Sequence, residues 1–217
     1  MSDQRRRRGR PDRSAAPTDA PPNYVRGLAP HNLLTAQQVV AVETEAERIL
    51  EEIGIDMAGN DDLCERFDAA GARVENGRVH FPAGLGHELC ATAPSEFTMT
   101  ARNPVRSVTF GGDNLVFGPG DSIPFVTDLD EGRRYGTVAD HANLTKLVQM
   151  SRGLHHNGQA VCEISDVAVN KRHLDLSFHQ LTLTDKPMMG ATLTPEAARD
   201  SLDMLRIVFG DETVGTS

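Results

Sequence analysis

GQAVCEI, residues 158–164, is a short apolar run that lies between two segments with helical spacing. NLVFG (114–118) stands before the first of these helical segments, and PMMGA (187–191) stands after the second. A third helical segment follows at about 194–210. Strands that are apolar throughout are typical of a parallel sheet covered on both faces. The order strand, helix, strand, helix, strand, helix therefore predicts an α/β fold for residues 113–217.

The helices of this region begin at residues that favour a helix start. Thr137 precedes the expected helix 138–152, and Asn170 is expected to cap the next one. Thr194-Pro195-Glu196 opens the third helix with a capping hydroxyl, a proline at the first helical position and an acid near the positive end. These residues predict where each of the three helices begins.

Two folds contain such a series: a (β/α)8 TIM barrel and an open, doubly wound sheet. The loop after the first strand lacks the G-x-G-x-x-G pattern of dinucleotide-binding sheets, which weakens the second fold. Pro119 in Gly118-Pro119-Gly120 also removes a backbone donor, so this turn is no phosphate cradle. Three units cannot close a barrel of eight. We therefore interpret residues 113–217 as the first part of a truncated barrel, or as an unusual half-assembly.

Residues 24–112 have a different pattern, which predicts an α+β region. Thr35 and Gln38 form a capping box before an amphipathic helix that ends at Gly54. Asn76-Gly77 lies between alternating segments, as in a tight hairpin. The other expected elements are helices at about 60–70 and 84–92 and a strand pair that turns near Asn103-Pro104.

Composition excludes several classes of protein. Residues 1–23 are rich in Arg and Pro and predict a disordered tail. The formal net charge is −9 although that tail is basic, so the body is acidic and does not suit nucleic-acid binding. No apolar run approaches the roughly 20 residues that span a bilayer. Cys64, Cys90 and Cys162 are widely spaced, which favours a reducing cytoplasm over a disulfide framework.

Five stretches, taken in order, resemble the trimethylamine methyltransferase family. They are NYVRGLAPHNLLTAQQV, ERILEEIGI, RVENGRVHFP, FGPGDSIPFVTDLDEGRRYGT and GATLTPEA. The resemblance covers nearly the whole chain and rests on order and spacing, and family members are about twice as long. It implies a TIM barrel behind an α+β N-terminal region, with the C-terminal half of such a protein absent here.

The resemblance also implies a function. Such an enzyme moves a methyl group from a methylated amine, either trimethylamine or a quaternary amine such as glycine betaine, to the cobalt of a corrinoid. A cognate corrinoid protein carries that cofactor and docks over the barrel mouth, and the methyltransferase binds no metal itself. A quaternary amine needs no acid catalyst because a neutral tertiary amine leaves. The site must instead place the methyl group in line with cobalt and exclude water.

Barrel chemistry lies at the C-terminal ends of the strands, which gives four candidate substrate-binding residues. Asp121 follows the turn after the first strand, and Phe117 is a nearby aromatic. Glu163 lies within an otherwise apolar strand, where a carboxylate is costly unless it is paired or faces the cavity. Asp166 follows that strand. Asp121 and Asp166 could equally cap local backbone, and no catalytic residue is identified.

Other interpretations are weaker. His155, His156 and Cys162 do not have the spacing of a known zinc site. A lyase or aldolase would need a Schiff-base lysine, but the three strands carry none and Lys186 precedes the third strand. A second hypothesis is a non-catalytic split or truncated fragment that acts by association with a partner half. In either case the open sheet edge predicts a homo-oligomer or aggregation.

Overall fold

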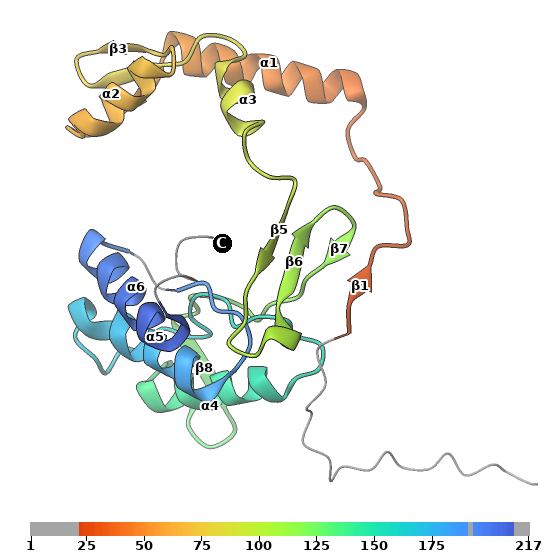
Figure 1. Ribbon diagram of the computed structural model, residues 1–217, viewed down its shortest axis with the longest axis vertical. Helices are drawn as coiled ribbons and strands as arrows, with labels where there is room; N and C mark the ends of the chain where they lie inside the picture. The colour runs from red at the N-terminus through yellow and green to blue at the C-terminus, as the bar shows by residue number, and fades with distance from the viewer. Residues whose placement is uncertain (1–21, 191–192, 211–217) are drawn as a thin grey trace, which may run out of the picture. The chain divides into compact units, whose positions relative to one another are not determined.

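The computed structural model of the chain describes residues 22–190 and 193–210. The fold is mixed α/β, with helices and four small antiparallel sheets among these residues (Figure 1). The chain forms two compact units, residues 27–95 and the remainder. Residues 1–21 of the predicted disordered tail lie outside the described part, and the predicted domain boundaries stay a prediction.

Residues 27–95 form a small α+β unit. Thr35 caps α1 with the predicted capping box, and Asn76-Gly77 turns the predicted hairpin with both residues at positive φ. The helices are α1 (Ala36–Glu52), α2 (Asp61–Ala69) and α3 (Leu85–Cys90), and the strands, in the order β2-β4-β3, are β2 (Ile55–Asp56), β3 (Arg73–Glu75) and β4 (Arg78–His80). Val79 and Phe81 lie in its core, against which Leu50 of α1 packs.

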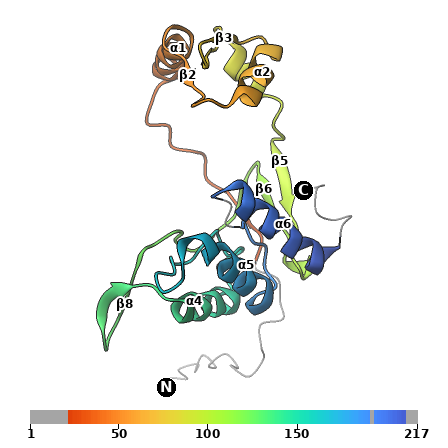
Figure 2. The same ribbon diagram turned by 90° about the vertical axis from the view of Figure 1, so that its left-hand side faces the viewer.

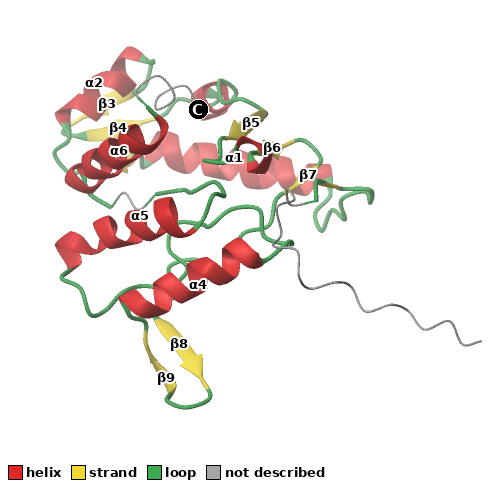
Figure 3. Cartoon of the chain, turned by 60° about the horizontal axis from the view of Figure 1, so that its bottom comes forward, coloured by secondary structure: helices red, strands yellow, loops and turns green. Residues whose placement is uncertain are grey.

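The described residues of the other unit form three two-stranded sheets and three long helices. The predicted strand pair near Asn103 is present as β5 (Glu96–Met99) with β6 (Val108–Gly111), joined through the short helix η1 (Pro104–Arg106). β1 (Tyr24–Val25) pairs with β7 (Asn114–Leu115), and β8 (Phe125–Asp128) with β9 (Gly132–Tyr135). The helices are α4 (Val138–Met150), α5 (Arg172–Leu183) and α6 (Pro195–Phe209), and η2 (Val169–Lys171) precedes α5. α4 contacts α5, and α5 contacts α6 (Figure 3).

The three predicted barrel strands are irregular segments with bends, and the prediction of regular strands was wrong for them. The backbone bonds described below run along residues 117–123, 155–163 and 187–189, which are called the three segments. Only Asn114 and Leu115 belong to a strand, and residue 191 lies outside the described part. Regular ladders are broken because Pro119 and Pro187 carry no N–H and because side chains take several backbone groups. The His155 ring, for example, accepts the Phe117 N–H at 3.0 Å.

The three segments nevertheless run side by side in the same direction. The N–H groups of His155 and Glu163 donate to the carbonyls of Phe117 and Ile123 at 2.7 and 2.9 Å. On the other side, the Asn157 N–H donates to Pro187 O at 3.1 Å, and the Met189 N–H donates to Gly158 O at 3.3 Å. For both pairs of neighbouring segments, residue numbers increase in the same direction along the two bonded segments. This is the arrangement of parallel strands. The middle segment, 155–163, is therefore flanked on both sides.

A hairpin that we did not predict joins the first segment to α4. β8 and β9 pair from Phe125↔Tyr135 to Asp128↔Gly132. Asp128 accepts two N–H groups within the turn, and Gly132 has φ +69°. The hairpin projects from the unit beyond α4 (Figures 2 and 3). The strand-favouring residues Phe125, Val126 and Thr127, followed by the Asp and Gly of the turn, were the signals in the sequence.

Candidate functional site

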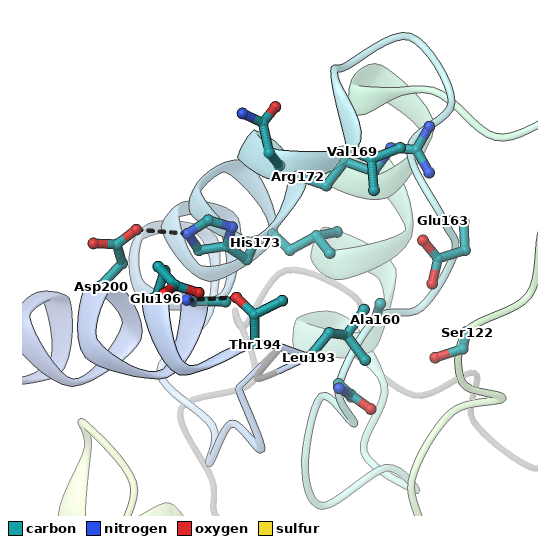
Figure 4. A pocket seen from close by; sticks show the side chains of 14 residues that line it. Ser122, Ala160, Glu163, Val169, Arg172, His173, Leu193, Thr194, Glu196 and Asp200 are labelled. Atoms are coloured by element: carbon teal, nitrogen blue, oxygen red, sulfur yellow. Dashed lines mark hydrogen bonds and ion pairs between the residues drawn. The ribbon is translucent and has the colours of Figure 1, made fainter. Parts of the chain in front are cut away.

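A cavity of about 610 Å³ lies beside the later residues of the first two segments and the starts of α5 and α6 (Figure 4). This volume is within the range of small-molecule sites, about 300–1,000 Å³. The lining includes Ser122 near the end of the first segment, Glu163 at the end of the second and Leu193 beyond the third. The rest of the lining is Gln159, Ala160, Val169, Asn170, Arg172, His173, Leu176, Thr194, Glu196, Ala197 and Asp200.

Glu163 is the carboxylate that the segments bring to the cavity. Its N–H donates to Ile123 O at 2.9 Å, which fixes the backbone on the neighbouring segment. Gly136 lies against this position, and a Cβ there would meet Glu163 O at 2.5 Å. The hairpin can therefore return beside Glu163 only through a glycine. The side chain itself is half-buried and faces the cavity (Figure 4).

The first turn of α5 brings Arg172 and His173 to the same cavity. Helix η2 precedes α5, so the helix begins at Arg172 behind Lys171, and Asn170 does not cap it as predicted. Arg172 Nε donates to Val167 O at 3.0 Å. His173 Nε2 lies 2.8 Å from Asp200 Oδ2, which ties α5 to α6. Only 12% of the His173 side chain is exposed, against 48% for Asp200.

Backbone N–H groups at the start of α6 are bonded by side chains of residues at that same helix end. The Thr194 hydroxyl accepts the Ala197 N–H at 3.2 Å, as predicted for this cap. The pKa of Glu196 is lowered, first because its carboxylate accepts its own backbone N–H and then because the Thr194 hydroxyl donates to it. A carboxylate and a hydroxyl thus counter the positive end of this helix.

The four predicted substrate-binding residues do not gather in one place. Glu163 lines the cavity, whereas Asp121, Asp166 and Phe117 are outside its lining. Asp121 accepts the N–H groups of Gln159 and Ala160 at 3.0 and 2.6 Å, and Asp166 accepts the Val138 N–H at 2.9 Å. Phe117 packs edge-on against Tyr24, with ring centroids 5.8 Å apart. Both aspartates hold backbone segments here, and a role in substrate binding stays a prediction for all four residues.

The residues considered for a zinc site or a Schiff base mostly make hydrogen bonds that stabilise the fold. His155 Nδ1 accepts the Phe117 N–H, and its Nε2 lies 3.0 Å from Pro22 O. Burial raises the pKa of the Cys162 thiol to about 11, so the neutral thiol is favoured. Lys186 Nζ donates to three backbone carbonyls. Residues 22–190 and 193–210 contain no group of three or more potential metal ligands.

No helix within the described residues is long and apolar enough to cross a membrane.

Comparison with known proteins identifies the family. The family described as Trimethylamine methyltransferase (MTTB) matches residues 2–217. The chain belongs to this family. A glycine betaine methyltransferase of Desulfitobacterium hafniense (strain Y51) is 37% identical over 187 residues, which are 86% of this chain and 39% of that protein. An L-carnitine:corrinoid methyltransferase of Eubacterium limosum is 29% identical over 104 residues, which are 48% of this chain and 21% of that protein. The chain therefore spans well under half of the length of either relative.

The polar residues of the cavity that sequence reasoning did not assign to the site include Arg172, His173 and Asp200. They lie on helices, whereas in a TIM barrel functional residues are expected on the loops after the strands. A usable signal was the position of Arg172 and His173 directly after the loop that follows Glu163. The first turn of a crossover helix faces the same end of the sheet as the end of the preceding strand.

Proposed function

We propose that this chain contributes the first three strand–helix units of a (β/α) barrel methyltransferase. The parallel order of the segments 117–123, 155–163 and 187–189 supports this fold. The cavity at their C-terminal ends supports the position of the site, because that end carries the chemistry of such barrels. The whole protein would need further units to close the barrel.

The activity is methyl transfer from a methylated amine to the cobalt of a corrinoid carried by a partner protein. Membership in the family and the names of its two relatives support this reaction. Both relatives are named for quaternary amines, so we propose a quaternary amine as substrate. The bound corrinoid supplies the nucleophile that accepts the methyl group. No acid is needed, because the departing tertiary amine leaves uncharged.

The residues of the chain bind and orient the substrate. Glu163 offers a negative charge to an ammonium group that cannot donate an N–H hydrogen bond. Apolar lining from Ala160 and Leu176 keeps water from the methyl groups. Val169 and Leu193 lie at the cavity with 73% and 85% of their surfaces exposed. Such an apolar rim fits a partner protein that must bring its cofactor to the cavity, so the residues present fit this cofactor arrangement.

The cavity with Glu163 carries the proposal, and methyl transfer tests it. The chain is mixed with glycine betaine and free cob(I)alamin, and the loss of the cobalt(I) absorbance is followed. We expect glycine betaine to speed this loss, and Glu163→Gln to lower kcat/KM about tenfold, which is about 1.4 kcal/mol of transition-state stabilisation. Glu65→Gln on the exposed face of α2 is the control and should change nothing. If no methylated amine is bound or demethylated, the proposal is wrong.

A further inference from the structure

One face of α1 and its C-cap carries apolar side chains that are exposed. We call this face the α1 stripe, and it consists of Val39, Val42, Ala46, Ile49 and Ile53. All five residues are exposed, and α1 contains no buried residue. Their spacing of three, four, three and four residues is that of the seam along which one helix packs against another. The α1 stripe therefore has the pattern of a helix–helix contact, although no described helix covers it.

An apolar groove lies beside the α1 stripe. Its volume is about 470 Å³, its walls come from α1 and α3, and its lining includes Leu50, Phe81 and Pro82. Ala46 belongs both to the lining and to the α1 stripe, so the two surfaces are continuous. A helix that lies along the stripe would also place side chains in this groove, as in helix-in-groove recognition.

The unit that contains α1 holds almost all of the net negative charge of the chain. Residues 27–95 contain 12 Asp and Glu against four Arg and no Lys, which gives −8 of the formal −9. Each of the four Arg forms an ion pair with a carboxylate of the same unit, as Arg48 does with Glu45. The proposed methyl transfer uses none of this charge, so another role for it is open.

Acidic residues of α1 border the stripe. In a two-stranded coiled coil, the positions beside the seam select the partner by charge. Three of these positions hold Glu43, Glu45 and Glu52, and none of them holds Lys or Arg. Among the described residues, Glu43 forms no ion pair. A second copy of the chain would bring carboxylates against carboxylates, which is destabilising. The border therefore favours a basic partner over a second copy.

We propose that the α1 stripe and the groove beside it bind a helix of another protein, whose apolar seam is flanked by Lys and Arg. The seam of that helix would remove the stripe from water, which is the main driving force of such association. Its cations would face the carboxylates of α1, which sets the choice of partner. The inference concerns residues 27–95 and does not depend on the function proposed for the cavity.

Two designed peptides test the inference by isothermal titration calorimetry with the full chain. Both are amphipathic helices with Leu along the seam, and they differ only in the flanking positions, which hold Lys in one and Glu in the other. We expect the Lys peptide to bind with a dissociation constant of about 10 μM, and the Glu peptide at least about tenfold more weakly. Added salt should weaken the Lys peptide, because it screens exposed charges.

Variants of the chain locate the binding surface. Val42→Asp should weaken the Lys peptide at least about tenfold, because a carboxylate in the contact loses its hydration. Val105→Asp is the matched control: both valines are 62% exposed, but Val105 lies outside residues 27–95. Glu43→Lys should also weaken the Lys peptide, and more than Glu65→Lys, which makes the same change of net charge on exposed α2. If Val42→Asp does not fold by circular dichroism, the two Glu variants still decide.

The other outcomes overturn the inference. Equal affinity for the two peptides, or equal loss in Glu43→Lys and Glu65→Lys, would mean that the border of the stripe does not select the partner. No binding of the Lys peptide would mean that the stripe is not accessible in the chain. Binding that begins only after deletion of residues 1–13 would assign the site to the Arg-rich start of the chain. A lower mass of Val42→Asp in light scattering would assign it to a second copy.

Discussion

At the scale of single residues, Lys186 is a charged side chain buried in the fold. Its ammonium is buried and donates to the carbonyls of Val148, Ser151 and Leu154 at 2.5, 2.7 and 2.8 Å, which closes the C-terminal end of α4. Burial lowers its pKa to about 8, so it is still charged at neutral pH.

Lys186→Met should lower the free energy of unfolding by about 3 kcal/mol, because three carbonyls lose their donor. Urea unfolding followed by circular dichroism measures the change. Lys146→Met, on the exposed face of α4, should cost under about 0.5 kcal/mol. Equal effects of the two substitutions would mean that the ammonium is not needed at the end of α4.

The pair His141 and His179 makes stability depend on pH. Their Nδ1 atoms are 2.9 Å apart, and His141 is fully buried. Burial, and then the charge of His179, lower the pKa of His141 to about 4 from its usual 6.5. Between these values the unfolded chain binds more protons than the folded chain, so acidification favours unfolding.

The free energy of unfolding should therefore fall by up to about 3 kcal/mol as the pH drops from 6.5 to 4. Urea unfolding at several pH values measures this slope. His141→Asn should flatten it, whereas His87→Asn, at an exposed position on α3, should leave it unchanged. An unchanged slope in His141→Asn would assign the acid sensitivity to other groups.

The residues of the candidate site could be predicted only in part from the sequence. Glu163 stood out because a carboxylate in an apolar run needs a reason to be there, and it does line the cavity. Asp121 and Asp166 looked similar, but they cap backbone, an alternative that local sequence could not decide. Arg172 and His173 escaped notice because the start of α5 depends on the turn η2, and Asn170 looked like the better cap.

At the scale of elements, the helices and the two antiparallel strand pairs before residue 112 were predicted well, and the three barrel strands poorly. Thr35, Thr137 and Thr194 each cap the helix that they were expected to cap, because a cap needs only neighbouring residues. Strand pairing instead depends on distant partners. The segment 158–164 is apolar enough for a strand, yet Asp121 takes two of the N–H groups near its start. Hydrogen bonds between remote residues thus decided what local pattern could not.

One side chain, Arg134, links the hairpin β8–β9 to the start of α4. Arg134 donates to both carboxylate oxygens of Asp140, at 2.6 and 2.9 Å, and to Asp128 at 3.0 Å. Arg134 and the Thr137 hydroxyl hold the pKa of Asp140 well below its usual range, with the Arg134 hydrogen bond as the largest cause. Since Asp140 also caps α4, Arg134 joins the hairpin to the start of that helix.

Arg134→Met should loosen the hairpin and leave the rest of the unit folded. We expect amide hydrogen exchange in residues 125–135 to rise about tenfold, which corresponds to a local opening that is easier by about 1.4 kcal/mol. Exchange in α5 should not change. Arg152→Met, at an exposed position without a partner role in the hairpin, is the control. Unchanged exchange in 125–135 would show that the hairpin does not need the Arg134 ion pairs.

At the scale of the whole molecule, we expect the edge of the first segment, residues 117–123, to favour self-association. Among the described residues, segment 155–163 flanks 117–123 on one side only. A groove of about 540 Å³ lies along this segment and α4, with Ile123, Leu144 and Leu147 in its lining. Leu147 is 61% exposed. Unpaired backbone beside an apolar groove favours association with another chain.

The chain made by itself should therefore self-associate, and light scattering after size exclusion measures the mass. Leu147→Asp should shift the distribution towards monomer, because a carboxylate in a closed contact loses its hydration. Val105→Asp, at a similarly exposed position outside the groove lining, should not shift it. A monodisperse wild-type monomer with a cooperative melting transition would contradict the prediction. It would mean that the three strand–helix units satisfy their own edge, and a barrel partner for the groove would no longer be required.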